Sequence, residues 1–189
     1  MAQINGVTVK ALKTFYGHEG EPLFQGNLYL ENKKIGFWSQ DARGAIVDDV
    51  ILERDYSEMA LRKQIIALNE DKTIKGKSMS GVDYTINYDL EKLMTDLLTL
   101  MNDEKSFKKA VKDGYAMTLV VSDYYHVSTW KLSNFYSSLT NDEIIKKLDK
   151  EITQAKSKMF KDEEIKIKIY RSLDDFVVGD KISLEDIKR

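Results

Sequence analysis

The stretch that decides the fold is Phe24–Gln40, with the sequence FQGNLYLENKKIGFWSQ. Two apolar runs, LYL at 28–30 and IGFW at 35–38, flank the polar segment ENKK. Asn tolerates the left-handed backbone conformation of tight hairpin turns, so we expect a β-hairpin that turns at Asn32. Strand alternation predicts one face with Leu28, Leu30, Ile35 and Phe37, and the other with Tyr29 and Trp38. Large side chains on both faces predict either a strand pair covered on both sides or an exposed binding face.

The composition is that of an ordinary globular protein. The chain has 189 residues, of which 42% are hydrophobic and 10% aromatic, and this length suffices for one well-buried domain or two small ones. The 29 basic and 31 acidic residues leave a net charge of −2. This balance argues against a strongly basic protein that coats DNA and against an acidic DNA mimic.

Cysteine is absent and there are only two histidines. Disulfides, thiolate zinc sites, iron–sulfur clusters and cysteine nucleophiles are therefore excluded, and we expect no cofactor. The N-terminal sequence MAQINGVTVK lacks a signal-peptide pattern, and no apolar run approaches the roughly 20 residues that span a bilayer. We expect a cytoplasmic protein without a membrane partner.

Strand patterns occur outside the hairpin as well. The turn-prone pair Asn5–Gly6 begins an alternating stretch. Polarity rises over 69–81 without any period, which predicts a linker. Alternation or β-branched and aromatic residues predict further strands at 4–16, 45–52, 82–86, 115–122, 124–131 and 164–171.

Helix patterns lie between these strands. Ser57 is a suitable N-cap for a first helix. Apolar spacing from Asp89 predicts a second helix, and a shorter third one follows over Asp103–Lys112. The T-x-x-E capping box at 140–143 predicts the start of a long helix.

Helices and antiparallel strands are interspersed without a βαβ repeat, which predicts an α+β fold. We expect an N-terminal β-hairpin unit with one helix, then a helix pair and an α+β meander. The linker divides the chain into a β-rich unit at 1–75 and an α+β unit at 82–189. A single domain is the alternative.

Aromatic side chains on the predicted strands are the candidates for a contact surface. The candidates are Tyr29, Trp38, Tyr124, His126 and Trp130. Aromatic residues of this kind anchor protein interfaces. His126 lies close to Asp123 in the sequence and could also act as a general base, although a packed or interface-facing strand is the favoured interpretation.

Two weaker sites are possible from the residue types. His18, Glu19 and Asp41 could supply an imidazole and hard oxygen ligands for Mg²⁺ or Mn²⁺, and a metal-activated water could then hydrolyse phosphodiesters. Lys166, Lys168 and Arg171 on a C-terminal strand could follow a nucleic-acid backbone. A surface loop and a solvated strand face are the simpler interpretations.

The passage from Phe15 to Gly44 resembles short uncharacterised proteins encoded by phages and mobile elements of low-GC bacteria. The resemblance is carried by GHEGEP, GNLYL, KKIGFWSQD and the glycine that follows. It covers about the first quarter of the chain and implies no catalytic residues. Small charge-dense proteins of this origin often bind a host machine, as anti-CRISPR and other anti-defence proteins do.

The sequence therefore favours a non-enzymatic binding protein that acts by protein–protein contact, for example as a phage-encoded, anti-CRISPR-like inhibitor of a host defence nuclease. The alternatives are a metal-dependent nuclease or phosphoesterase and a nucleic-acid-binding module. The sequence specifies neither the partner's identity nor an oligomeric state.

Overall fold

The computed structural model describes residues 1–41, 47–77, 82–123, 126–159 and 165–189. The fold is α+β, as the sequence predicts. Its contacts separate two compact units, one formed by 1–99 with 177–189 and the other by 100–176. This division falls within a helix, whereas the division predicted from composition at 76–81 stays a prediction.

The first unit is built on a curled, mixed sheet of six strands with the order β11-β1-β2-β3-β4-β5. β1 and β11 pair in parallel, and all other neighbours pair antiparallel. The strands are β1 (Gln3–Ile4), β2 (Val7–Tyr16), β3 (Pro22–Leu30), β4 (Lys33–Asp41), β5 (Val47–Leu52) and β11 (Val177–Val178).

The predicted hairpin is formed by β3 and β4. Leu30 pairs with Lys33, so Glu31 and Asn32 make a two-residue turn. Both have positive φ, 48° and 65°, as the type I′ turn of a tight hairpin requires. The predicted turn at Asn32 is confirmed.

A bulge in β4 changes the predicted faces of this hairpin. Leu28 pairs with Gly36, but Tyr29 pairs with Lys34, so Ile35 is the extra residue. The extra residue reverses the alternation after it. Trp38 therefore joins Leu28 on the buried face, and the prediction that Phe37 lies there is wrong.

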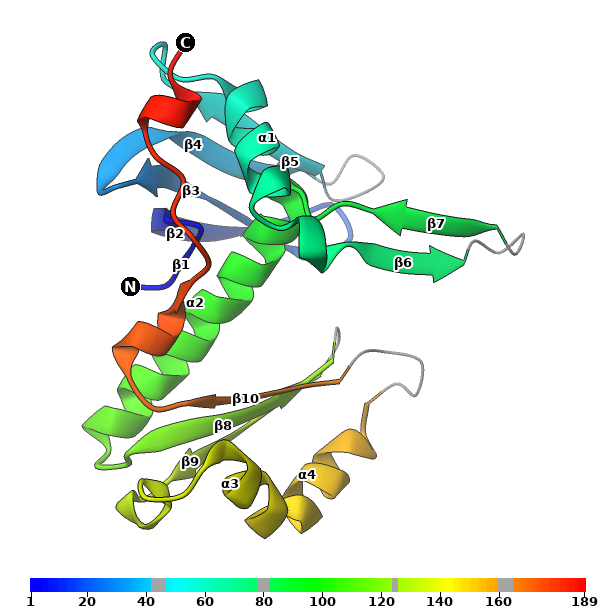
Figure 1. Ribbon diagram of the computed structural model, residues 1–189, viewed down its shortest axis with the longest axis vertical. Coiled ribbons are helices and arrows are strands. Elements are labelled where there is room, and N and C mark those ends of the chain that lie inside the picture. The colour runs from blue at the N-terminus through cyan, green and yellow to red at the C-terminus, as the bar shows by residue number, and fades with distance from the viewer. Residues whose placement is uncertain (42–46, 78–81, 124–125, 160–164) are drawn as a thin grey trace. The chain divides into compact units, whose positions relative to one another are not determined.

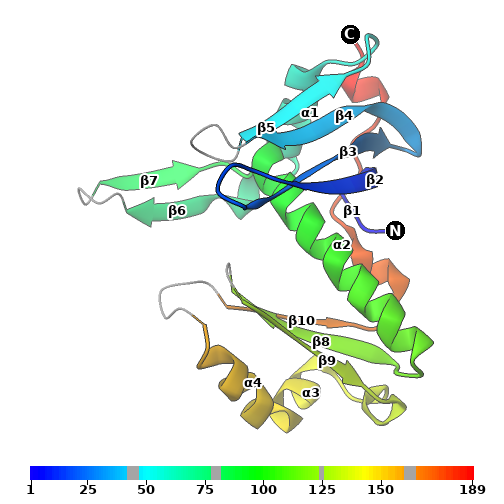
Figure 2. The same ribbon diagram turned by 180° about the vertical axis from the view of Figure 1, so that it is seen from behind.

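Two helices cover one face of this sheet (Figures 1 and 2). They are α1 (Glu58–Ala67) and the first part of α2 (Leu90–Lys112). The predicted N-cap is confirmed, because Ser57 Oγ accepts the Ala60 N–H at 3.3 Å. The covered sheet side chains, here called the inner face, are all buried and comprise Val7, Val9, Leu28, Leu30, Ile35, Trp38 and Val50.

The C-terminal segment 177–189 also belongs to this unit. β11 pairs with β1, the Ile182 N–H donates to Asn5 O, and the Ser57 N–H donates to Ile187 O. Ile182 and Ile187 are buried. The end of the chain thus completes a unit that its beginning starts.

Residues 70–77, predicted as a linker, contain regular structure instead. A 3₁₀ turn at Glu70–Lys72 leads into β6 (Ile74–Lys77), which pairs antiparallel with β7 (Asp83–Ile86). The two strands form a ribbon separate from the six-stranded sheet (Figure 1). Its polar composition resembles that of a linker because a two-stranded ribbon buries little apolar surface.

The second unit has a three-stranded antiparallel sheet with the order β10-β8-β9. The strands are β8 (Met117–Ser122), β9 (Val127–Leu132) and β10 (Lys166–Tyr170). On one face, Tyr170 bonds to Asp103 of α2 through its hydroxyl. On the other face, Met117, Leu119 and Val121 pack in one core with α3 (Asn141–Lys147) and α4 (Asp149–Lys156).

The helices differ from their predicted lengths in two places. The helices predicted from Asp89 and over Asp103–Lys112 run together as α2, since no glycine or proline separates them. The long helix predicted after Thr140 bends at Leu148, whose φ is −105° and ψ 20°. The capping box itself is confirmed, with Thr140 and Glu143 bonding reciprocally. No helix in the described part of the chain is long and apolar enough to cross a membrane.

Candidate functional site

The face of the six-stranded sheet opposite α1 carries Tyr29, one of the two candidate contact residues in the first unit. Cross-strand pairing aligns Lys10, Asn27, Phe37 and Ile51 in one row. We call this surface the open face. It comprises Thr8, Lys10, Gln25, Asn27, Tyr29, Lys34, Phe37, Ser39, Asp49 and Ile51, and Figure 2 looks onto it.

Large apolar groups are exposed on the open face. Ile51 is 71% exposed and Phe37 36%. They lie opposite one another on β4 and β5, so their side chains are neighbours on the same face. The curled sheet therefore presents apolar groups to solvent on the side that its helices leave uncovered.

Tyr29 extends this apolar surface toward β2. Its side chain is partly buried, and the Lys10 ammonium lies 4.2 Å from the ring centroid. This distance is that of a cation–π contact. Tyr29, which the sequence singled out, is thus on the open face and held in place by a neighbour across the strand.

Trp38, the other candidate in the hairpin, is fully buried. The bulge at Ile35 turns the indole toward the inner face, where a partner cannot reach it in this structure. Phe37 and Ile51, and not Trp38, are the large apolar side chains exposed on the open face. A signal for Ile51 was present, because it alternates with Val50 in β5 and only one of the two can face the core.

The three residues predicted to bind a metal ion do not belong to any metal-binding group among the described residues. His18 and Glu19 are exposed in the turn between β2 and β3, and Asp41 ends β4. In that turn Glu21 Oε2 accepts the Glu19 N–H at 2.9 Å, so the carboxylate of Glu21 stabilises the loop. Over the described residues, no group of three or more His, Asp or Glu side chains could hold a metal ion.

The aromatic strand of the second unit is mostly structural. Trp130 is partly buried and packs against the core shared by β8 and the helices α3 and α4. The Asp123 carboxylate accepts the His126 N–H at 2.5 Å and lies 3.4 Å from its Nδ1, which ties the turn between the strands. Tyr124 lies outside the described residues. This arrangement favours turn stabilisation over general-base catalysis by His126.

Of the three basic residues predicted for one strand, Lys166 and Lys168 lie in β10 and Arg171 follows its end. Lys166 and Lys168 are partly exposed on one face. Arg171 is occupied instead, because its guanidinium donates to Leu139 O at 2.6 Å and to Asn141 Oδ1 at 2.9 Å. These bonds hold the loop before α3, so Arg171 has a structural role. A contact between Arg171 and a phosphate would require these bonds to break.

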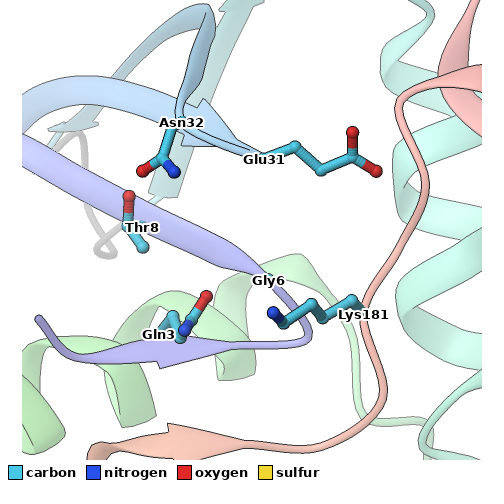
Figure 3. A pocket seen from close by; sticks show the side chains of 6 residues that line it. All are labelled: Gln3, Gly6, Thr8, Glu31, Asn32 and Lys181. Carbon is cyan, nitrogen blue, oxygen red and sulfur yellow. The ribbon is translucent and has the colours of Figure 1, made fainter.

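The first unit also contains a polar hollow of about 310 Å³. Figure 3 shows its six lining residues, with Asn32 and Thr8 pointing toward one another and Lys181 pointing toward Gln3. Glu31, also on its rim, accepts the Leu184 N–H at 3.3 Å through Oε1. The lining contains no histidine and its only carboxylate already holds the C-terminal segment, so the hollow carries no catalytic assignment.

No protein-family model, curated protein or solved structure matches this chain.

Proposed function

We propose that this chain is a non-enzymatic binding module that contacts a protein partner through the open face. The observation that supports this is the exposure of Phe37 and Ile51, side by side on a sheet face that the unit's own helices leave uncovered. Aromatic and aliphatic anchors of this kind dominate the binding energy of protein interfaces. The resemblance to phage and mobile-element proteins makes a bacterial defence nuclease the first partner to test.

The experiment is affinity capture from a bacterial lysate with the wild-type chain and a Phe37→Ser/Ile51→Ser variant. Ile51 is 71% exposed and Phe37 36%, so the variant should stay folded but unfold at a somewhat lower urea concentration than the wild type. We expect a partner that the wild type captures and the double variant loses, and inhibition of a CRISPR or restriction nuclease that disappears with it.

The matched control is Met59→Ser. Met59 is 81% exposed but lies on α1, away from the open face. It should leave capture unchanged. A partner retained equally by all three proteins, or no partner and no effect on a nuclease, would contradict the proposal.

A further inference from the structure

β5 forms one edge of the six-stranded sheet. It pairs with β4 on one side, and no other strand among the described residues pairs with its outer side. An edge strand offers a row of unpaired backbone groups to which another strand can add. The open face reaches this edge through Asp49 and Ile51, both of which are exposed.

The hydrogen-bond pattern identifies which backbone groups point outward. The Glu53 N–H donates to Ile35 O at 2.9 Å, so these directly opposed residues form a hydrogen-bonded pair. Hydrogen-bonded and non-hydrogen-bonded pairs alternate along an antiparallel ladder. Leu52 and Val50 are therefore in non-hydrogen-bonded positions, and their N–H and C=O groups point away from β4.

The side chains at this edge select the chemistry of an added strand. Asp49 presents a carboxylate, and Ile51 two residues later presents an apolar group beside Phe37. Residues directly opposed in an antiparallel pair share a face. An added strand would therefore place one side chain against the carboxylate and another against the apolar pair.

A second copy of this chain fits the edge poorly. If β5 paired antiparallel with itself and kept both open faces together, Asp49 would oppose Asp49, Ile51 or Glu53 of the other copy, depending on register. Each register sets a carboxylate against another carboxylate or against an aliphatic side chain. Like charges directly opposed destabilise a strand pair, so the charge pattern favours a basic strand from another protein.

We propose that β5 binds an extended, basic segment of the partner by strand addition, with a lysine or arginine against Asp49 and an apolar side chain against Ile51 and Phe37. In antiparallel addition the apolar residue precedes the basic one by two positions. Main-chain hydrogen bonds would supply affinity and the two side-chain contacts would supply specificity. This inference rests on the proposed function and names the partner's chemistry.

The test uses a capped seven-residue peptide of threonine and valine that carries one isoleucine and, two positions later, one lysine. The first control peptide has glutamate in place of the lysine. The second keeps the lysine but carries N-methyl groups on the amides that would pair with β5. Binding is followed by NMR through the amide shifts of residues 49–52 and through the affinity at low salt.

We expect the lysine peptide to shift the β5 amides and to bind about three- to ten-fold more tightly than the glutamate peptide. N-methylation should abolish binding, because it removes the donors while it leaves the charge. The variant Asp49→Lys, at an exposed position, should reverse the preference between the two charged peptides. The N-methyl comparison on the wild type decides the outcome even if that variant folds poorly.

The inference is overturned if the lysine peptide leaves the β5 amides unshifted, if the N-methylated peptide binds as well, or if a self-associated dimer through β5 accounts for the shifts. Its failure differs from failure of the proposed function. A lysate partner that depends on Phe37 and Ile51 but is indifferent to Asp49→Lys would keep the open face as a binding site and remove the pairing of a basic residue with Asp49.

Discussion

The side-chain amide of Asn69 donates to Asn5 Oδ1 at 2.9 Å, and this bond joins two buried residues 64 positions apart. Asn5 lies in the turn between β1 and β2, and Asn69 follows the end of α1. The same Asn69 amide donates to Ile65 O at 2.7 Å. Asn5 in turn donates through Nδ2 to Asp180 O at 2.9 Å. The pair thus connects the first turn, the first helix and the C-terminal segment of one unit.

Asn69→Ala should destabilise the first unit by about 2–3 kcal/mol. It leaves buried acceptors at Asn5 and Ile65 without their donor, and an unsatisfied buried polar group costs about 1–3 kcal/mol. Urea unfolding followed by the amide signals of this unit measures the change. Asn87→Ala, at an exposed position of the same unit between β7 and α2, is the control and should be nearly neutral. Equal stability of the two variants would show that the amide pair contributes little.

A side chain at Gly179 should destabilise the protein through a steric clash as well as through the left-handed backbone conformation. Its φ is +74°, and a Cβ there would lie 2.7 Å from Asn5 Nδ2. Gly20 has a similar φ of +81° but open space around it. We expect Gly20→Ala to cost about 1 kcal/mol from the left-handed conformation, and Gly179→Ala to cost about 1–3 kcal/mol more from the clash.

Thermal unfolding of these two variants isolates the cost of the clash at Gly179. The two glycines have similar φ angles, so the cost of the left-handed conformation is nearly the same in both variants. A large loss for Gly179→Ala supports the view that the C-terminal segment is clamped onto Asn5. Similar losses for both variants would show that the segment can move away from Asn5 at little cost.

Local patterns in the sequence predict much of this fold. The turn at Asn32, the N-cap at Ser57 and the capping box at Thr140 all depend on residues within four positions of one another. Such signals need no knowledge of the rest of the chain. They suffice to identify an α+β protein and most of its strands.

Features set by long-range packing were not predictable in this way. The bulge at Ile35 arises between paired strands, and it exchanges Phe37 and Trp38 between the two faces. The pairing of β11 with β1 joins the two ends of the chain. Alternation places Tyr29 on the face opposite Leu28 and Leu30, but the apolar row beside it depends on a register that one sequence does not reveal.

Ala11→Gly should be neutral or stabilise the protein by up to about 1 kcal/mol. Ala11 has a φ of +54° at a bulge between β2 and β3. The left-handed region destabilises alanine by roughly 1–2 kcal/mol, whereas glycine costs about 0.4–1 kcal/mol through the greater freedom of the unfolded chain. The control Ala67→Gly, at the end of α1, should destabilise by up to about 1 kcal/mol. Chemical denaturation that gives both variants the same loss would contradict strain at Ala11.

The second unit contains a buried carboxyl group whose ionisation opposes folding. Asp103 is 3% exposed, and its Oδ2 accepts a 2.7 Å bond from the Tyr170 hydroxyl. Burial raises the pKa of Asp103 above its usual value of 3.8, although the Tyr170 bond and the charge of Lys168 act in the opposite direction. Tyr170 also stacks on Phe176, with ring centroids 4.4 Å apart, so the ring that carries the donor hydroxyl packs against an apolar neighbour.

The sign of the pH dependence follows from this raised pKa. Well below pH 3.8 the Asp103 carboxyl is protonated in both states. As the pH rises toward the folded pKa, unfolding releases a proton, so this group's contribution to stability falls and then levels off above the folded pKa. Asp103→Asn keeps an oxygen acceptor for Tyr170 and removes the charge. The stability of this variant relative to the wild type should therefore increase with pH across that window.

Asp113 provides a control of opposite sign in the same unit. The Lys131 ammonium lies 2.6 Å from its carboxylate and lowers the pKa of Asp113. Its contribution is present above pH 3.8 and is lost as the pH falls through the lowered pKa. Urea unfolding from pH 3 to 7 should give Asp113→Asn a relative stability that decreases as the pH rises, while that of Asp103→Asn increases. Parallel slopes for the two variants would contradict the assignment of Asp103 as the carboxyl whose burial opposes folding.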